Sequence, residues 1–133
     1  MGRISDRSVP LIFKEECFQI IGACFEVHNE LGSGFLEEVY HEALKLEFID
    51  RSVPATSKPK LEIRYKGKIL KKNYEPDFVF FSAIVLELKA AKALDDAHRA
   101  QLFNYLKATV FELGLLINFG CKRELEWERI IYK

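Results

Sequence analysis

The residues best suited to chemistry lie in one short stretch of the sequence, EPDFVFFSAIVLELKA, which begins at residue 75. Its two apolar runs are typical of strands, yet they carry Asp77, Glu87 and Lys89. Side chains alternate between the two faces of a strand, so Glu87 and Lys89 share a face. A three-residue loop centred on Ser82 would place Asp77 opposite Glu87 on that face, whereas a two-residue loop would separate the two acids. We expect the three-residue loop or a bulge.

Two carboxylates held side by side repel each other unless a cation lies between them. Oxygen ligands with open water positions favour Mg²⁺ or Mn²⁺, and the sequence has no Cys or His pair at the spacing that Zn²⁺ requires. The Lys89 ammonium could stabilise negative charge on a phosphate or help to deprotonate a metal-bound water. The alternative is that Glu87 and Lys89 form an exposed ion pair on an edge strand.

Two helices are predicted before the strands. Apolar residues at positions 13, 17, 20, 21, 24, 27 and 31 recur at helical spacing and predict a helix over about residues 11–31, which Gly32 would end. A second helix is predicted over residues 35–50. Its apolar stripe would comprise Leu36, Val39, Tyr40, Ala43, Leu44, Leu46 and Phe48.

The rest of the sequence predicts strands and one more helix. The runs KLEIRY and KILKKNY read as two strands with one buried and one exposed face, joined by a tight turn at Lys66 and Gly67. A third helix is predicted from Asp95 and Asp96 to about Ala108, and ELGLLINFG and EWERIIY read as two final strands. The order of helix, helix, three or four strands, helix, strand, strand predicts an α/β mixed sheet with helices packed on it.

Polar residues on two of these helices could reach the same site. Glu37 lies at the margin of the apolar stripe of the second helix and can lean toward the sheet. His98, Gln101 and Tyr105 fall within one narrow sector of the third helix. Each of these residues has an ordinary alternative, because polar residues at helix margins are commonly satisfied by backbone groups or water.

Length and charge limit the possible classes of protein. The 133 residues suit a single domain spanning 1–133. Twenty basic and twenty acidic residues cancel, so no overall positive field indicates nucleic-acid binding. Basic residues are nevertheless concentrated at positions 58–72, which include Lys66, Lys68, Lys71 and Lys72. The ordinary reading of such a run is a solvated hairpin face.

The cysteines and the apolar segments bear on the compartment. Cys17, Cys24 and Cys121 form no C-x-x-C pair and leave one thiol unmatched, which favours reduced thiols, with Cys17 and Cys24 as small core residues. The sequence lacks an apolar leader and any segment of 18 or more uncharged apolar residues. We therefore expect a cytoplasmic protein without a membrane-spanning segment.

Three segments resemble a known family. Pro76 and Asp77, nine intervening residues and the E-L-K of residues 87–89 resemble the signature of the PD-(D/E)xK nuclease superfamily. GFLEEVY has Gly34, Glu37 and Tyr40 at the spacing of the GxxExxY family, a small branch of that superfamily. HRAQLFNYLKAT is similar to the RecB-like Q-x-x-x-Y motif. The resemblance covers nearly the whole chain from about residue 14.

The resemblance implies a restriction-endonuclease-like core, a mixed sheet flanked by helices. It implies that Asp77 and Glu87 bind the metal ion, helped by the backbone carbonyl of Leu88, and that Lys89 is the catalytic lysine. The other residues that it implicates are the accessory acid Glu37, the helix pair Gln101 and Tyr105, which orient the site or touch the nucleic-acid backbone, and His98 at the edge.

These observations predict a phosphodiesterase that depends on Mg²⁺ or Mn²⁺ and acts on nucleic acid, DNA more than RNA. The expected nucleic-acid contacts are Lys66, Lys68, Lys71, Lys72 and His98. No separate recognition element is evident, so a homo-oligomer or a targeting partner could supply specificity. Two alternatives stay open: a subunit that keeps the fold but only binds nucleic acid or protein, and a hydrolase of another phosphate ester.

Overall fold

The structure is a computed structural model and describes residues 3–4 and 13–132. Its elements are β1 (Arg3–Ile4), α1 (Lys14–Leu31), α2 (Glu37–Asp50), β2 (Thr56–Ser57), β3 (Leu61–Tyr65), β4 (Lys68–Tyr74), β5 (Phe78–Phe80), β6 (Ile84–Lys89), α3 (Asp96–Ala108), β7 (Leu113–Asn118) and β8 (Glu126–Ile131). The predicted order is confirmed, with two additional two-residue strands. The expected start of the first helix at residue 11 lies outside the described residues.

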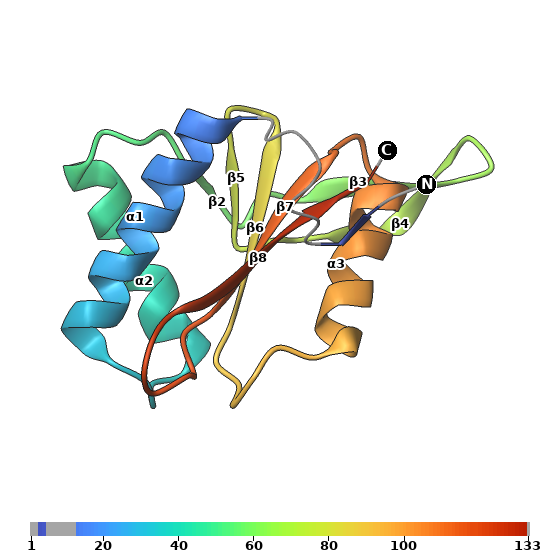
Figure 1. The fold of residues 1–133 in the computed structure, drawn as a ribbon. Coiled ribbons are helices and arrows are strands. Elements are labelled where there is room, and N and C mark those ends of the chain that lie inside the picture. The colour runs from blue at the N-terminus through green and yellow to red at the C-terminus, as the bar shows by residue number, and fades with distance from the viewer. Residues whose placement is uncertain (1–2, 5–12, 133) are drawn as a thin grey trace.

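Six strands form the main sheet, in the order β1-β8-β7-β6-β5-β2. Strands β6 and β7 pair in parallel and the other neighbours are antiparallel, so the predicted mixed sheet is confirmed. Helices α1 and α2 lie against one face and α3 against the other (Figure 1). The parallel pair is central and covered on both faces, which explains why its strands are almost continuously apolar.

Alternation along β6 divides its side chains between the two cores. Ile84, Leu86 and Leu88 pack into the core beneath α1 and α2, and Val85 packs into the core beneath α3. The same alternation puts Glu87 on the face of Val85, as the sequence predicts, and the structure shows that this face is the α3 side.

The third helix lies close to the sheet and begins where predicted. The Asp95 side chain accepts a hydrogen bond from the His98 backbone N–H, and the His98 side chain accepts one from the Asp95 N–H, which forms a capping box. Gly114 lets the helix approach β7, because a Cβ at that position would lie 2.9 Å from Cδ2 of Leu102. Helix α3 therefore packs closely against β7, the strand next to β6.

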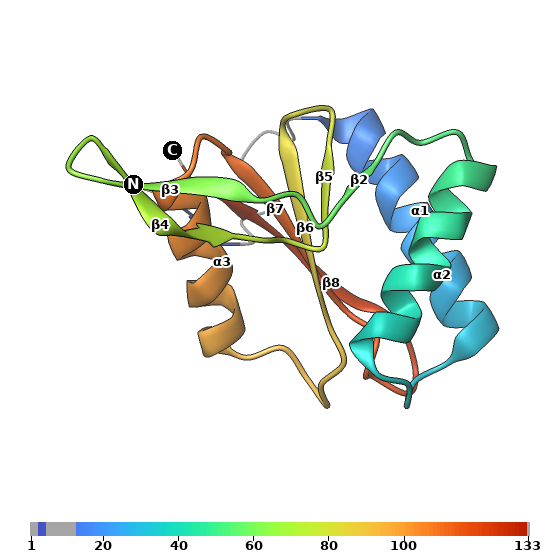
Figure 2. The same ribbon diagram turned by 180° about the vertical axis from the view of Figure 1, so that it is seen from behind.

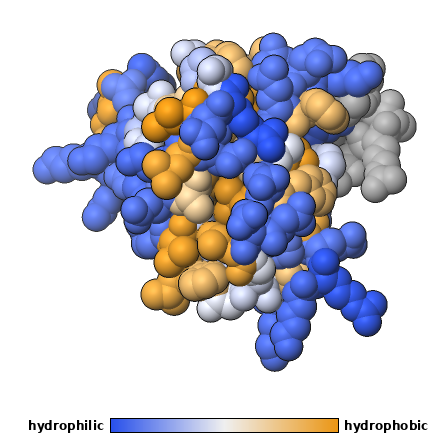
Figure 3. Space-filling model, turned by 90° about the vertical axis from the view of Figure 1, so that its left-hand side faces the viewer, coloured by the Kyte–Doolittle hydropathy of each residue, from blue (hydrophilic) through white to orange (hydrophobic). Residues whose placement is uncertain are grey.

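The predicted apolar stripe of α2 is too wide. Tyr40, Leu44 and Phe48 are buried, and Ala43 packs at the edge of the core. Leu36, Val39 and Leu46 are exposed instead, because α2 contacts the sheet and α1 through a narrower strip than the sequence pattern suggests. Apolar side chains are visible on this outer helical face in Figure 3.

Strands β3 and β4 form a separate two-stranded sheet. The predicted turn is confirmed: Lys66 and Gly67 have φ values of 49° and 78°, and two positive φ values are typical of a type I′ hairpin turn. The prediction of one buried face is wrong for β4, which is exposed from Lys68 to Asn73. Only its end packs against the body, so the hairpin projects past α3 (Figure 2).

Cysteines 17 and 24 are buried core residues with free thiols, as expected, and Cys121 is a partly buried free thiol. Among the helices described, none has both the length and the apolarity needed to cross a membrane.

Candidate active site

Asp77 and Glu87 meet where β5 begins and β6 ends. The register pairs Phe80 with Ile84 and Phe78 with Leu86, so a three-residue loop joins β5 to β6 and Asp77 lies opposite Glu87. The Asp77 backbone N–H donates to Oε1 of Glu87 at 3.2 Å. The predicted loop length, and with it the juxtaposition of the two acids, is confirmed.

Residue Leu88 also helps to place the first acid. Its backbone N–H donates to Oδ2 of Asp77 at 3.0 Å, so this carboxylate lies against the β6 backbone. The backbone carbonyl of Leu88 stays a predicted metal ligand. The geometry brings Asp77, Glu87 and the Leu88 backbone into one small region at the end of β6.

The electrostatics of this pair favour an added cation. Burial raises the pKa of Glu87 to about 7, and the nearby Asp77 charge adds to the rise. The Lys89 charge acts in the opposite direction. A carboxyl group with such a pKa is poorly compensated by its own protein surroundings, as expected of a site that binds a positive ion.

Lys89 extends from the same strand toward α3. Its Nζ donates to Oε1 of Gln101 at 3.1 Å. Gln101 is exposed on α3, and this hydrogen bond holds the ammonium group on the side of the sheet that also carries Glu87. The structure therefore brings together three of the predicted site residues from two elements.

Glu37 approaches the site from the first turn of α2. Burial raises its pKa; the Lys89 charge lowers it and the Asp77 charge raises it further. Glu37 thus lies within the electrostatic field of both residues, although among the described residues its side chain makes no hydrogen bond to them. By contrast, Glu38 faces solvent, where Lys58 binds it at 2.9 Å, as expected for a solvated residue.

Gly34 and Tyr40, which flank Glu37 in the segment GFLEEVY, have structural roles. The Tyr40 hydroxyl donates to the Gly32 carbonyl at 2.6 Å and accepts from the Phe35 N–H at 3.2 Å. Its buried ring stacks on Phe119 at 4.5 Å. Gly34 has a φ of 111°, which L side chains rarely adopt. Gly34 and Tyr40 together fix the loop from which α2, and hence Glu37, begins.

Tyr105 lies one layer away from the carboxylates. Its ring stacks on Tyr74 with centroids 3.9 Å apart and planes 5° apart. The Tyr74 hydroxyl is buried and makes no hydrogen bond within the described part of the chain. Burial raises the pKa of Tyr74, and the Glu87 charge adds to the rise, which places the hydroxyl beside that carboxylate. Tyr105 thus adjoins the surroundings of Glu87 through Tyr74, which was not among the predicted site residues.

The histidine on α3 lies near the accessory acid. His98 Nδ1 accepts the Asp95 N–H at 3.2 Å in the capping box. A positive charge on His98 is the smallest of the causes that shift the pKa of Glu37 and acts to lower it. The capping bond occupies Nδ1, so Nε2 remains for the predicted nucleic-acid contact.

A second missed residue is His41. Its ring is buried and stacks on Phe78 at 4.3 Å. Nδ1 lies 3.0 Å from Oδ1 of Asp77, and Nε2 lies 2.7 Å from Oγ of Ser57. Nδ1 is thus placed to donate to the Asp77 carboxylate, and Nε2 shares a hydrogen bond with the Ser57 hydroxyl. A usable signal existed, since His41 lies four residues from Glu37 on the same helix face.

The four lysines predicted to bind nucleic acid lie apart from the carboxylates. They occupy the exposed hairpin: Lys66 at the turn and Lys68, Lys71 and Lys72 on β4. These lysines would therefore contact nucleic acid on the hairpin surface, outside the group of carboxylates.

The donor set fits a hard divalent cation held partly by water or substrate. Within residues 3–4 and 13–132, no group of three or more His, Cys, Asp or Glu side chains is arranged to hold a metal ion by itself. Two carboxylates with a backbone carbonyl suit Mg²⁺ or Mn²⁺, which commonly keep several waters or bind substrate phosphate. Each carboxylate also has more lone pairs than its protein partners use. The residues present therefore fit such an ion.

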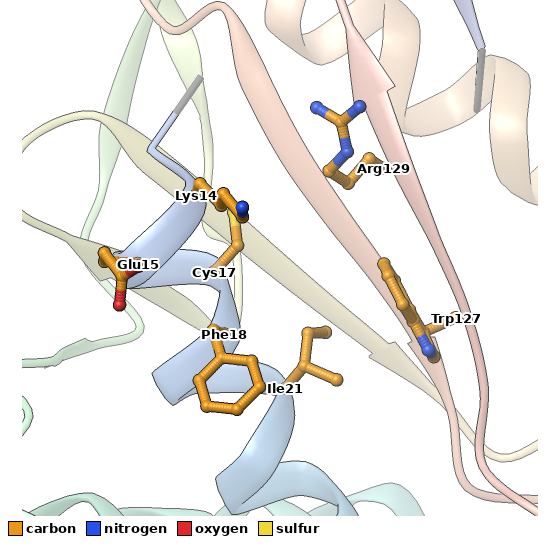
Figure 4. Close-up of a pocket in the computed structure, with 7 residues that line it drawn as sticks. All are labelled: Lys14, Glu15, Cys17, Phe18, Ile21, Trp127 and Arg129. Carbon is orange, nitrogen blue, oxygen red and sulfur yellow. The ribbon is translucent and has the colours of Figure 1, made fainter. Parts of the chain in front are cut away.

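An apolar pocket of about 410 Å³ lies elsewhere, between α1 and β8 (Figure 4). It is lined by Lys14, Glu15, Cys17, Phe18, Ile21, Trp127 and Arg129. None of the predicted site residues lines this pocket, and its mainly apolar walls offer no paired carboxylates. The predicted site residues lie instead at the end of β6.

Comparison with known proteins is consistent with this arrangement. A family model described as the PD-(D/E)XK nuclease superfamily matches residues 14–130. The crystal structure of SSO0001 is similar to this chain, with a TM-score of 0.54 and 22% identity over 71% of this chain and 49% of that one. The chain thus spans about half the length of that protein, and the likeness concerns the fold. No curated protein matches significantly.

Proposed function

The chain belongs to the PD-(D/E)XK nuclease superfamily, and on that basis we propose that it is a nuclease that uses Mg²⁺ or Mn²⁺ to hydrolyse phosphodiester bonds, in DNA rather than RNA. Its mixed sheet flanked by helices is the restriction-endonuclease-like fold. The observation that carries the proposal is the register that sets Asp77 opposite Glu87, with Lys89 two residues further along β6.

The acids would bind the metal ion. Asp77 and Glu87 supply carboxylate oxygens, the Leu88 carbonyl supplies a backbone oxygen, and Glu37 faces the same region from α2. A divalent cation at this position would stabilise negative charge on the phosphate and lower the pKa of the attacking water. Asp77 is held for this role on both oxygens, by His41 on one side and by the Leu88 N–H on the other.

Lys89 and the α3 residues would act on the substrate. The Lys89 ammonium, held by Gln101, is suited to stabilise the negative charge that the phosphate gains as water attacks phosphorus. Tyr105 stacks on Tyr74, whose buried hydroxyl lies beside Glu87, so the two rings form the wall next to this carboxylate. His98 and the hairpin lysines would contact the nucleic-acid backbone.

We also propose that the chain belongs to the GxxExxY branch. The supporting observation is that the three residues of the motif act as one unit. Gly34 supplies the unusual backbone conformation, Tyr40 closes the loop through two hydrogen bonds, and Glu37 is presented toward the site.

Cleavage assays test the proposed activity. Purified protein is incubated with single- and double-stranded DNA and RNA in Mg²⁺, Mn²⁺ or chelator, alongside Asp77→Ala and Lys89→Ala. We expect metal-dependent cleavage of DNA that falls by roughly 100-fold or more in either variant, because each removes charge stabilisation. Exposed Lys122, changed to Ala, serves as the matched control.

Two results would count against the proposal. Cleavage that survives both Asp77→Ala and Lys89→Ala would remove the catalytic assignment. A folded protein that cleaves no polymer under any of these conditions, yet binds nucleic acid, would instead support a subunit that keeps the fold without the reaction.

A further inference from the structure

The β3–β4 hairpin is a projecting ribbon whose exposed charged side chains are mostly basic. Within the residues that the structure describes, it is not hydrogen-bonded to the six-stranded sheet, and its residues that pack against the core beneath α3 are Leu61, Ile63 and Tyr74. The rest of β4 is exposed, and the turn extends beyond α3 (Figures 1 and 2). The hairpin thus presents a two-stranded surface that the described residues of the chain leave open.

The net charge of the hairpin is positive. From the start of β3 to the end of β4 the sequence has five basic residues and one acidic residue, Glu62. The Glu62 carboxylate pairs with Arg64 at 3.4 Å. Among the described residues, Lys66, Lys68, Lys71 and Lys72 make no ion pair with an acid. Protection of an exposed strand edge requires only a few charges, so it does not account for this excess of positive charge.

The acidic residues lie on the other side of the molecule. Between residues 14 and 50, which include both helices of the first layer, there are nine acidic and two basic residues. This layer and the hairpin lie at opposite ends in Figure 1. A polyanion would therefore be attracted to the hairpin side and repelled from the α1–α2 layer.

The hairpin also has apolar side chains and a fixed position relative to the site. Tyr65, Ile69 and Leu70 are exposed among the cations, and Lys66 Nζ lies 5.5 Å from the centroid of the Tyr65 ring. Strand β4 runs from Lys68 to Tyr74, which is beside Glu87. Six strand steps span about 20 Å, and this corresponds to roughly six base pairs of duplex DNA.

We propose that the β3–β4 hairpin binds in the major groove of double-stranded DNA, about half a helical turn from the bond at the carboxylate site. This inference rests on the proposed nuclease function for its choice of a nucleic-acid ligand. The major groove of B-form DNA, about 12 Å wide, admits a two-stranded ribbon. The deep, narrow major groove of A-form RNA does not, and a single strand has no groove. Lysines contact phosphates on both walls while the apolar residues face base edges.

The test measures binding without cleavage. Fluorescence anisotropy in chelator compares a 24-base-pair DNA duplex with the same sequence as single-stranded DNA and as duplex RNA. The hairpin variant carries Lys68→Gln, Lys71→Gln and Lys72→Gln. The control carries Lys14→Gln, Lys45→Gln and Lys122→Gln, which are also exposed and change the net charge equally. Circular dichroism checks that both fold.

We expect the wild-type chain to bind duplex DNA at least 10-fold more tightly than the other two ligands. Each lost phosphate contact reduces the slope of log K against log salt by about 0.9, so the hairpin variant should lose roughly 2 to 3 from that slope. The control should keep the wild-type slope. Methylation of guanine N7 in the major groove should weaken wild-type binding.

Several outcomes would overturn the inference. These are a hairpin variant that matches the control, equal binding of single-stranded DNA or duplex RNA, and indifference to N7 methylation. Failure of the nuclease proposal is recognisable separately. In that case duplex binding through the hairpin persists in chelator, but added Mg²⁺ or Mn²⁺ produces no cleavage.

Discussion

Nδ1 of the buried His41 lies 3.0 Å from Oδ1 of Asp77. The other ring nitrogen lies 2.7 Å from Oγ of Ser57, so α2 and β2 together fix the imidazole. Because Leu88 N–H binds Oδ2, both oxygens of Asp77 are oriented by the protein before any ion arrives. Residues that orient metal ligands in this way control metal affinity and activity.

Replacing His41 should weaken metal binding. His41→Ala leaves Oδ1 of Asp77 without its donor, and loss of such an orienting partner typically costs 10- to 100-fold in metal affinity or activity. His41→Asn keeps an N–H donor near the position of Nδ1 and should recover part of the loss. Isothermal titration with Mn²⁺ and cleavage as a function of metal concentration measure both.

The matched control for this prediction is His28, another buried histidine, which binds the Cys121 carbonyl at 2.9 Å. His28→Ala should lower stability and leave the metal-concentration midpoint unchanged. An unchanged midpoint in His41→Ala would show that the imidazole is merely structural.

Glu87 should make stability depend on pH when no metal is present. Its folded pKa of about 7 exceeds that of an unfolded glutamate, so the folded state binds the extra proton and is favoured at low pH. This stability is lost as pH rises through about 7. Glu87→Gln should therefore be more stable than wild type at pH 8 in chelator, by on the order of 1 kcal/mol. Urea unfolding from pH 5 to 8 measures the difference.

The exposed Glu75, changed to Gln, is the control for that measurement. Its unfolding curve should follow the wild-type pH dependence. If wild type and Glu87→Gln lose stability in parallel between pH 5 and 8, Glu87 is not the group responsible.

Removal of the Tyr74 hydroxyl should be tolerated by the fold. The group is buried without a hydrogen-bond partner, so Tyr74→Phe removes a desolvated polar atom and should be neutral or slightly stabilising. Tyr74→Ala should cost about 3 to 5 kcal/mol, because it also removes the ring that stacks on Tyr105. Chemical denaturation gives both values. A loss above about 1 kcal/mol in Tyr74→Phe would indicate a hydrogen bond to Glu87 instead.

The loop before α2 should depend on Tyr40. Tyr40→Phe leaves the Gly32 carbonyl and the Phe35 N–H without their partner and should cost about 1 to 3 kcal/mol. Tyr65→Phe, at an exposed hairpin position, should change the unfolding free energy by less than about 0.5 kcal/mol. Equal effects of the two substitutions in urea titrations would contradict the proposed role of Tyr40.

Local patterns predicted the elements well where one physical rule dominates. Asp95 was identified as the start of a helix because it can cap exposed N–H groups, and the structure has the capping box there. The Lys66–Gly67 turn was found because two strand-like runs flank a glycine that accepts positive φ. By contrast, β1 and β2 contain two residues each, and so short a segment has no period to detect.

Burial was harder to predict than secondary structure. Leu36, Val39 and Leu46 fit an apolar stripe by helical geometry, yet they are exposed because the stripe is wider than the surface that packs against α2. The alternation in β4 likewise suggested a buried face, although most of the strand has no neighbouring layer. A sequence pattern describes what a segment could bury, whereas the neighbouring elements decide how much surface is covered.

By itself, the sequence determined that Glu87 and Lys89 share a strand face and that a polar strip lies on α3, because these relations depend on the repeat of a single element. Tertiary structure alone decided that His41 binds Asp77 and that the Tyr74 hydroxyl lies beside Glu87. Those contacts join residues that are 36 and 13 positions apart in the sequence. Their distances depend on how helices and strands pack against one another, which no local period specifies.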